Sequence, residues 1–356
     1  SAAMQLVDMI KSNWKNKFVA VVFIDLRKAF DTVDSKRLAC KLKRLGLSHS
    51  AAKLMLSYLQ NRQTATRIGR NTSSLRTVNV GVPQGSKMGP LNFIVYINDL
   101  LKLDLIGQLV LYADDAALIY AHDSPRSLQI AMQHDLDLLH EWLCRNVLSL
   151  NVGKTCYVTF GRAKNISDLS ITVDGTVINR VRKYKYLGLI IDEDLNFHAH
   201  VDHVRKQITP FISLMWRKGK YIPIERRKQM YFAYVHSHLT YMLPIYGECA
   251  GYKLKELQTL QNRCIKAIYR LDRNTSTTYL YSTGLLPMTE LVKFERVVYV
   301  HKLVNSLTKH NFRFTINSDV HGRSTRRNSH VHIFNHHSGT ANSANVALST
   351  ALSEFN

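Results

Sequence analysis

The sequence contains few cysteines, few acidic residues and no long hydrophobic run. Its five cysteines are an odd number and form no Cys-x-x-Cys pair, which argues against a disulfide framework and predicts a reducing compartment, the nucleus or the cytoplasm, rather than secretion. No apolar stretch approaches the ~20 residues that span a bilayer, and the N-terminus lacks the pattern of a signal peptide. We therefore expect no membrane partner.

Acidic residues are outnumbered throughout. Lys and Arg number 48 against 26 Asp and Glu, which gives a formal charge of +22 on 356 residues. The excess is local as well, since residues 201–313 hold 19 Lys and Arg against 7 Asp and Glu. Solvated helix faces would explain interspersed charges but not so one-sided a balance, so a polyanion, with nucleic acid as the first candidate, is the expected partner. The chain has 46% apolar residues, enough to form a hydrophobic core. Its 356 residues are enough for two or more folded domains.

The most informative stretch is LVLYADDAALIY, residues 109–120. Its two short apolar arms favour strands, and the aspartates between them suit the tip of a hairpin. Asp114 and Asp115 would then be two like charges held side by side, which is costly without a partner. A hard divalent cation such as Mg²⁺ is the natural one. The alternative for a bare Asp-Asp pair is a solvated turn between two ordinary strands.

Two other segments carry candidate site residues. Residues 18–26, FVAVVFIDL, predict a strand buried on both faces with Asp25 at its end; this acid could equally be the N-cap of a helix opened by the following RKAFD. Residues 81–90, GVPQGSKMGP, contain three glycines and two prolines. Such a turn before a helix lets the backbone approach a ligand closely, although most loops of this composition have no ligand.

The remaining pattern alternates between helices and short strands before residue 195 and is helical from there to about residue 308. A Pro at position 210 should kink or divide the first helix of this helical part. The expected helices before it lie at residues 3–12, 35–59 (divided at Gly46), 91–101 and 125–148. The expected strands and hairpins lie at residues 61–80, 155–160, 169–181 and 184–192.

The last segment, residues 309–356, is rich in Ser, Asn, Thr and His. It contains His330, His332, His336 and His337, but their spacing fits no standard zinc pattern and no cysteine lies nearby. We expect a poorly ordered polar tail rather than a structural metal site.

Each signal is weak alone, but their order is specific and resembles the reverse transcriptase of non-LTR (LINE-type, jockey-like) retrotransposons. The residues that carry the resemblance are FIDLRKAFDTVD at 23–34, GVPQGSKMGPLNFIVYINDL at 81–100, LYADDAALIY at 111–120, LNVGKT at 150–155 and YKYLGLIID at 184–192. The thumb of that family is similar to YMLPIYGECA at 241–250 and LQTLQNRCIKAIYRL at 257–271.

The resemblance implies an α+β fold, with the palm of a right-hand polymerase, an antiparallel sheet backed by helices, followed by an all-helical thumb-like domain. Residues 1–194 would form the palm with partial fingers, residues 195–308 the thumb-like domain, and residues 309–356 the tail. The implied activity is RNA-directed DNA polymerisation, in which two Mg²⁺ ions, with Mn²⁺ as an alternative, assist transfer of a nucleotide from a dNTP to a primer 3′-hydroxyl. The implied partners are an RNA template, a DNA primer and a dNTP.

The resemblance also implies residue roles. The metal ions would be held by Asp25, Asp114, Asp115 and the main-chain carbonyl of Leu26. Lys154 would protonate or neutralise the departing pyrophosphate, and is therefore grouped with the three acids as catalytic. The nucleotide and template would be lined by Phe30, which would exclude a ribose 2′-hydroxyl, and by Gln84, Gly85 and Tyr112. The primer grip would comprise Tyr186, Leu187 and Gly188.

The chain also departs from the family. Only about 24 residues precede Asp25, so the basic residues of the fingers that hold the triphosphate have no visible equivalent, and no endonuclease domain or Cys-rich knuckle is present. The chain is therefore expected to be a fragment of a longer polyprotein with little or no polymerase activity alone. The alternative is a catalytically inactive nucleic-acid-binding remnant. A maturase or a telomerase is disfavoured by the thumb likeness at residues 241–271.

Overall fold

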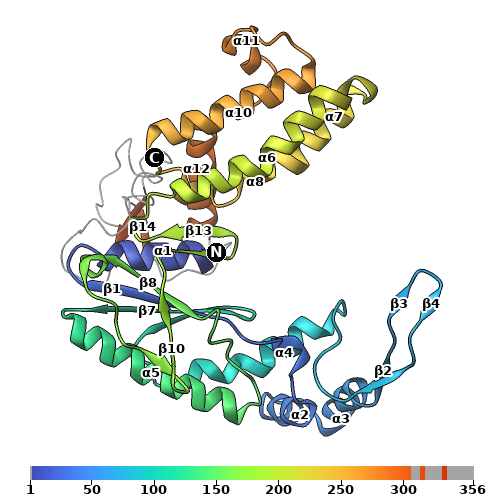
Figure 1. Cartoon of the computed structure of the whole chain (residues 1–356), viewed down its shortest axis with the longest axis vertical. Helices are drawn as coiled ribbons and strands as arrows, with labels where there is room; N and C mark the ends of the chain where they lie inside the picture. The colour runs from blue at the N-terminus through green and yellow to red at the C-terminus, as the bar shows by residue number, and fades with distance from the viewer. Residues whose placement is uncertain (1, 306–312, 317–330, 335–356) are drawn as a thin grey trace. The chain divides into compact units, whose positions relative to one another are not determined.

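The computed structural model describes residues 2–305, 313–316 and 331–334 (Figure 1). The chain divides into two compact units. The first, here called the sheet unit, is Asn13–Arg182. The second, the helical unit, combines Ala3–Ser12 with the chain from Lys183 onward. The helix expected at residues 3–12 forms as α1 (Ala2–Asn13) and groups mainly with the helical unit although it precedes the first strand of the sheet unit in the sequence.

The sheet unit is built on five strands in the order β11-β8-β1-β7-β6. The pairs β6–β7, β7–β1 and β1–β8 are antiparallel, as predicted, but β11 runs parallel to β8. The sheet is therefore antiparallel, as expected, except at this edge pair. The strands are β1 (Phe18–Ile24), β6 (Gln108–Tyr112), β7 (Asp115–His122), β8 (Cys156–Gly161) and β11 (Asn179–Arg180).

The central strand β1 is apolar along its whole length and buried from Val19 to Ile24. Side chains of a strand point alternately to opposite faces, so this burial means that both faces of the sheet are covered, as the continuous apolar run predicted. The face that carries Ala20, Val22 and Ile24 shares one hydrophobic cluster with the helix α5 (Pro125–Arg145). That face and α5 thus form the hydrophobic core of the sheet unit.

Helix α5 shows how closely the sequence pattern fixes the packing. Ser124 caps its N-terminus by accepting a hydrogen bond from the Ser127 amide. A fully buried acid on the helix, Asp135, accepts hydrogen bonds from the amides of Ile106 and Gly107, at 3.0 and 2.7 Å. This clamp fixes the chain just before β6 against the helix. The apolar side chains that recur at helical spacing along α5 are all buried: Leu128, Met132, Leu136, Leu139, Trp142 and Leu143.

The remaining elements of the sheet unit largely follow the predictions. The expected division at Gly46 separates α2 (Ser35–Arg44) from α3 (His49–Leu59). The segment at residues 61–80 forms two successive ladders of one long hairpin, with strands β2 (Arg62–Thr64), β3 (Arg67–Ile68), β4 (Asn71–Thr72) and β5 (Arg76–Val78). The Asp-Gly hairpin forms from β9 (Thr172–Val173) and β10 (Thr176–Val177).

One helix boundary differs from the expectation. Helix α4 (Met88–Ile97) begins three residues before the predicted start and continues as the 3₁₀ turn η2 (Asn98–Lys102). It includes Pro90 in its first turn, where a proline lacks only an amide that would have no intrahelical partner. The prolines and glycines at 81–90 therefore exclude regular structure only over the first part of that segment.

The helical unit opens with the hairpin predicted at residues 184–192, formed by β12 (Lys183–Tyr186) and β13 (Leu189–Asp192). Its helices are α6 (His198–Lys218), α7 (Ile224–Tyr231), α8 (Ser237–Thr240), α9 (Leu243–Tyr246), α10 (Gly251–Tyr269), α11 (Thr277–Tyr281) and α12 (Met288–Val304), with a π-helical turn at Phe232–His236. Helix α6 runs uninterrupted through Pro210, so the proline does not divide it. None of the helices in the described part of the chain is long and apolar enough to cross a bilayer.

The predicted polar tail lies mostly outside the described residues. Two short strands are described there, β14 (Arg313–Ile316) and β15 (Val331–Phe334), and they pair antiparallel. Of the four tail histidines considered as metal ligands, His330, His332, His336 and His337, only His332 falls within a described element.

Candidate nucleotidyl-transfer site

Strand register brings the predicted acids to one end of the sheet. The last pair between β1 and β7 joins Ile24 to Ala116. One residue further along each antiparallel strand, Asp25 comes opposite Asp115. The β6–β7 ladder closes at the pair Tyr112–Asp115, so the turn between these strands also lies at this end. The expected hairpin is therefore present, and its acids lie beside the end of the central strand.

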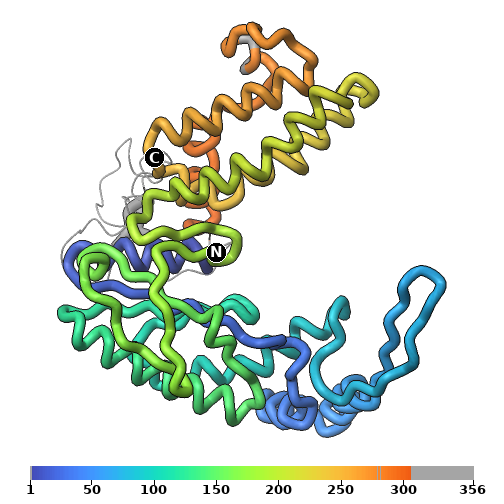
Figure 2. Tube along the Cα trace, in the orientation of Figure 1, coloured from blue at the N-terminus to red at the C-terminus, as the bar shows by residue number. Residues whose placement is uncertain are grey.

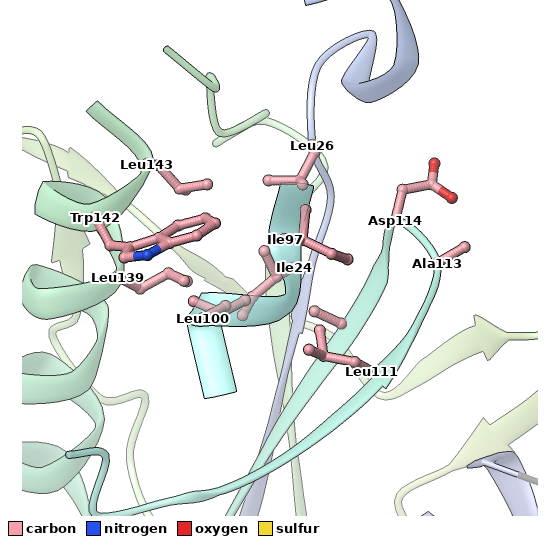
Figure 3. A pocket seen from close by; sticks show the side chains of 11 residues that line it. Ile24, Leu26, Ile97, Leu100, Leu111, Ala113, Asp114, Leu139, Trp142 and Leu143 are labelled. Carbon is pink, nitrogen blue, oxygen red and sulfur yellow. The ribbon is translucent and has the colours of Figure 1, made fainter. Parts of the chain in front are cut away.

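The turn of this hairpin consists of Ala113 and Asp114 rather than of the two aspartates, since Asp115 is already the first residue of β7. Ala113 has a φ of 54°, a conformation that residues other than glycine seldom adopt. Beneath the turn lies an apolar pocket lined by Leu26, Leu111 and Trp142, among others. Figure 3 shows the Asp114 carboxylate pointing away from these apolar side chains. The apolar side chains thus hold the hairpin in place, and the Asp114 carboxylate faces away from them, where it can interact with polar groups.

The electrostatics of the site show that the carboxylates are close. The pKa of the Asp115 carboxyl is raised, first because the surrounding protein removes part of the hydration of this solvent-accessible group and then because the charges of Asp114 and Asp25 repel its ionised form. A bound cation would relieve this repulsion, so the donor set has the chemistry that a hard divalent ion prefers. Among the residues that the structure describes, however, no three His, Cys, Asp or Glu side chains are gathered closely enough to hold a metal ion.

Asp25 is held by a residue to which sequence reasoning gave no role. The Asn151 side-chain amide donates a hydrogen bond to Asp25 Oδ2 at 2.8 Å, and the Asn151 backbone amide donates to the Asp25 carbonyl at 2.8 Å. The alternative role of Asp25 as a helix N-cap fails, because the next helical element is the short 3₁₀ turn Ala29–Asp31, whose N-cap residue is Lys28. Asn151 lies in the LNVGKT segment, but its contact with Asp25 spans 126 residues of sequence.

The same segment places two other predicted residues. Leu26 forms an isolated antiparallel bridge with Leu150, which ties the chain just after β1 to the segment before Asn151. The amide of Lys154 donates to the Asn151 carbonyl at 3.0 Å, closing a turn in which the Lys154 side chain is exposed. The register between β1 and β8, in which Phe23 faces Cys156, puts this turn at the same end of the sheet as Asp25.

The glycine-rich loop is joined to the segment that follows Asp25. Gln84, which is exposed, donates a side-chain hydrogen bond to Asp31 Oδ1 at 2.9 Å. Gly81 has a φ of 77°, and a Cβ there would come within 2.7 Å of the Asp31 backbone, so only glycine fits this close approach. Gly85 is exposed, with a φ of 80° and open space around it. Asp31, like Asn151, is hydrogen-bonded to a predicted site residue, and sequence reasoning gave it no role.

Phe30 and Tyr112 lie differently from each other. The Phe30 ring packs on the Phe93 ring of α4, with centroids 4.4 Å apart, so Phe30 also contributes to the core of the sheet unit. Tyr112 is 60% exposed at the end of β6. Its side chain is therefore accessible to a ligand at this end of the sheet.

The predicted primer-grip residues belong to the helical unit. Leu187 and Gly188 form the two-residue turn between β12 and β13, with φ values of 46° and 84°. The Tyr241 hydroxyl donates a hydrogen bond to the Leu187 carbonyl, and a Cβ on Gly188 would meet the Tyr241 ring at 3.0 Å. Tyr186 is buried just before the turn.

Comparison with known proteins identifies the family. Residues 3–191 match the family described as reverse transcriptase (RNA-dependent DNA polymerase). This chain belongs to the reverse transcriptase family. The matched region contains all three carboxylates, the Gln84 loop, Asn151 and the Leu187–Gly188 turn.

Similar proteins of known origin come from non-LTR elements, which confirms the resemblance to jockey-like reverse transcriptases. The chain is 29% identical over 266 residues to the RNA-directed DNA polymerase from mobile element jockey of Drosophila funebris, covering 71% of this chain and 29% of the relative. It is 29% identical over 264 residues to the probable RNA-directed DNA polymerase from transposon BS of Drosophila melanogaster, with 71% and 29% covered. The chain thus spans under a third of the length of these relatives.

Among solved structures, the reverse transcriptase chain is similar to telomerase from Candida tropicalis. It matches the apo form at 12% identity and a TM-score of 0.40, covering 86% of this chain and 54% of that one. It matches the complex with a TWJ fragment of telomeric RNA at 11% identity and a TM-score of 0.40, covering 86% of this chain and 45% of that one.

Proposed function

We propose that this chain is the polymerase portion of a non-LTR retrotransposon protein, and that it carries the site at which the longer protein catalyses RNA-directed DNA synthesis. The reaction is transfer of a nucleotide from a dNTP to the 3′-hydroxyl of a primer paired with an RNA template. The observation that carries the proposal is the register that sets Asp25 opposite Asp115, with Asp114 in the adjoining turn. Membership of the reverse transcriptase family supports it.

In this proposal the three carboxylates, with the Leu26 carbonyl, hold Mg²⁺, or Mn²⁺ in its place. The support is the strand register that brings Asp25, Asp114 and Asp115 to one end of the sheet, together with the pKa of Asp115, which is raised first by loss of hydration and then by the charges of Asp114 and Asp25. Bound Mg²⁺ would neutralise phosphate charge and favour ionisation of the primer hydroxyl. Asn151 orients the Asp25 carboxylate through its 2.8 Å hydrogen bond, so the acid need not be reorganised when ligands arrive.

Other residues act on the substrates in this proposal. Gln84, oriented by Asp31, and Gly85 line the incoming nucleotide and the template, together with Tyr112. Phe30, fixed by its contact with Phe93, excludes a ribose 2′-hydroxyl. The exposed ammonium of Lys154 neutralises or protonates the departing pyrophosphate. The turn at Leu187 and Gly188, with Tyr186, supports the primer strand.

We also propose a role for each part of the chain, a partner and a cellular compartment. Residues 1–194 would serve as palm with partial fingers, residues 195–308 as the thumb-like domain and residues 309–356 as a polar tail. The net charge of +22 supports a template–primer duplex as partner. The five cysteines are all free, which supports the nucleus or the cytoplasm as the place of action.

The test measures metal binding and extension separately. Mn²⁺ binding is followed by water proton relaxation, and primer extension is assayed on an RNA template with Mg²⁺. Asp114→Asn should weaken Mn²⁺ binding by about tenfold or more and lower the extension rate by about 10²–10³-fold, while binding of the template–primer duplex is kept.

The matched control is Asp123→Asn, which removes an exposed aspartate just after the other end of β7. It carries the same change of charge and should leave metal binding and extension unchanged. The polymerase proposal fails if Asp114→Asn binds Mn²⁺ as tightly as the unaltered chain.

A second candidate is the inactive remnant that binds nucleic acid without chemistry. It is favoured by the lack of any group of three metal-ligating side chains among the described residues. The remnant predicts duplex binding with no specific Mn²⁺ site and no extension in either metal. The same two measurements therefore distinguish it from the enzyme.

A further inference from the structure

The long hairpin formed by β2–β5 has a one-sided composition. Residues 60–80 contain four arginines, Arg62, Arg67, Arg70 and Arg76, and no Asp, Glu or Lys. The rest of the segment is rich in Gln, Asn, Ser and Thr, whose side chains also bind phosphate oxygens. The hairpin thus has the composition of a surface that meets an anion of repeated charge.

The structure leaves this hairpin open to solvent. Every residue from 63 to 77 is exposed, and the strand pairs run only between its own arms, β2 with β5 and β3 with β4. Figures 1 and 2 show the β3–β4 end standing away from α2 and α3 of the same unit. A two-stranded ribbon that packs on no other element is at best marginally stable in water, so a partner that binds along it would stabilise it.

The three outer arginines are available for such a partner. Arg67, Arg70 and Arg76 make no ion pair with any other residue that the structure describes. Arg67 only donates to the Gly69 carbonyl at 3.2 Å within the tip. The planar fork of arginine matches the oxygens of a phosphodiester better than a lysine does. All the cationic side chains of the hairpin are arginines, which are well suited to bind phosphate oxygens.

The base of the hairpin is joined to the candidate site. The Arg62 guanidinium donates to the carbonyls of Val80 and Gly81, both at 2.9 Å, and to the Leu59 carbonyl at 3.1 Å. This fastens the hairpin to the start of the loop that carries Gln84. A nucleic acid that reaches Gln84 would thus lie close to the root of the arginine-bearing arm.

From these observations we infer that the outer arginines of this hairpin bind the phosphodiester backbone of the nucleic acid that occupies the candidate site. The inference rests on the proposed function for the identity of the ligand. The arm from Arg62 to Gly69 is about 25 Å long at ~3.3 Å per residue, which matches about seven steps of a duplex at ~3.4 Å each. The contact would be independent of base sequence, because phosphates carry none.

The test compares two triple variants of the whole chain by fluorescence anisotropy with a labelled RNA–DNA hybrid. The first is Arg67→Gln, Arg70→Gln and Arg76→Gln. The matched control is Lys36→Gln, Lys43→Gln and Arg44→Gln, which removes three exposed charges from α2 of the same unit. The hairpin variant should bind about tenfold or more weakly at ~100 mM salt, and its log K against log salt slope should be shallower by about two to three.

The control variant should lose less than about threefold in affinity and keep its slope. Equal losses in the two variants, or none in the hairpin variant, would overturn the inference. So would a change in oligomeric state by sedimentation with unchanged hybrid affinity, since the hairpin would then pair with a second copy. All variants alter exposed side chains, and a circular-dichroism melt verifies that each remains folded.

Two strands could supply the phosphates, and neutral methylphosphonate linkages distinguish them. Placed in the RNA strand alone or the DNA strand alone, they should abolish the difference between the unaltered chain and the hairpin variant only in the strand that the arginines contact. A difference that persists with both strands neutralised would contradict phosphate recognition. The anisotropy assay measures hybrid binding and needs no nucleotide transfer. Failure of the hairpin inference is therefore seen in the hybrid affinity of the hairpin variant. Failure of the polymerase proposal is seen instead in Mn²⁺ binding and primer extension by Asp114→Asn.

Discussion

The turn between β6 and β7 and the turn between β12 and β13 each contain two residues, and each begins with a residue other than glycine at positive φ, Ala113 at 54° and Leu187 at 46°. Their surroundings differ. The first is flanked by exposed Tyr112 and Asp115, whereas the second is flanked by Tyr186 and Leu189, which are buried.

This contrast separates two ways of using a tight turn. At the second turn a glycine relieves half of the backbone strain, and the Tyr241 side chain both covers the turn and binds its carbonyl. At the first turn the position after Ala113 is an aspartate, and its neighbour is another. Partial loss of hydration and the charges of two neighbouring acids, Asp114 and Asp25, raise the pKa of the Asp115 carboxyl, which costs stability. The first turn carries carboxylates that repel one another, whereas the second is covered by the Tyr241 side chain, and substitutions should separate these two effects.

The largest effect on stability is expected at the second turn. Gly188→Ala puts a Cβ at a φ of 84° and within 3.0 Å of the Tyr241 ring, and should lower the free energy of unfolding by about 2 kcal/mol. Gly175→Ala is the matched control, because Gly175 has a φ of 69° with nothing within 4 Å of its Cβ, and it should cost only about 1 kcal/mol. Urea unfolding measures both.

Equal costs at the two glycines would mean that the Tyr241 contact contributes nothing. Tyr241→Phe keeps the ring and removes the hydroxyl that donates to the Leu187 carbonyl, so it should cost about 1 kcal/mol. The comparison would be broken if Gly188→Ala were tolerated as well as Gly175→Ala.

A smaller and pH-dependent effect is expected at the first turn. The folded protein holds the Asp115 proton more tightly than the unfolded chain does, because its pKa is raised by burial and by Asp114 and Asp25. The ionised form is therefore destabilising, and the protein gains stability as the pH falls through the raised pKa towards the ordinary value of 3.8. Asp115→Asn should raise the melting temperature at pH 7, with a gain that disappears near pH 4.

The second turn carries no acid or histidine, so the change in melting temperature caused by Gly188→Ala should be the same at both pH values. Calorimetry at pH 7 and pH 4 makes the comparison. A gain for Asp115→Asn that is equally large at pH 4 would show that the substitution acts through packing instead of charge.

The local pattern of apolar and polar residues was sufficient to predict the strands that flank both turns. The two short apolar arms of residues 109–120 predicted a hairpin, and the apolar run at residues 18–26 predicted a strand buried on both faces. Order along the chain then indicated the family. The parallel edge strand β11 was not predictable, because its two residues, Asn179 and Arg180, carry no apolar pattern.

What the sequence could not give was partners across long separations. The hydrogen bond from Asn151 to Asp25 spans 126 residues, that from Gln84 to Asp31 spans 53, and that from Tyr241 to the Leu187 carbonyl spans 54. No periodicity encodes such contacts, since they depend on how separate elements meet. The grouping of α1 with the helical unit, although it precedes β1, is of the same kind.

The smallest effect is expected from Ala113→Gly at the first turn. Ala113 adopts a φ of 54° with a Cβ that disfavours it, so glycine removes that strain but adds freedom to the unfolded chain. The net gain should be about 0.5 kcal/mol in urea unfolding, and a loss would show that Ala113 packing on the apolar pocket outweighs the strain. If the turn is shaped for a ligand, its conformation should matter more for function than for stability. Mn²⁺ binding should therefore weaken in Ala113→Gly even as stability rises, because a looser turn holds Asp114 less well.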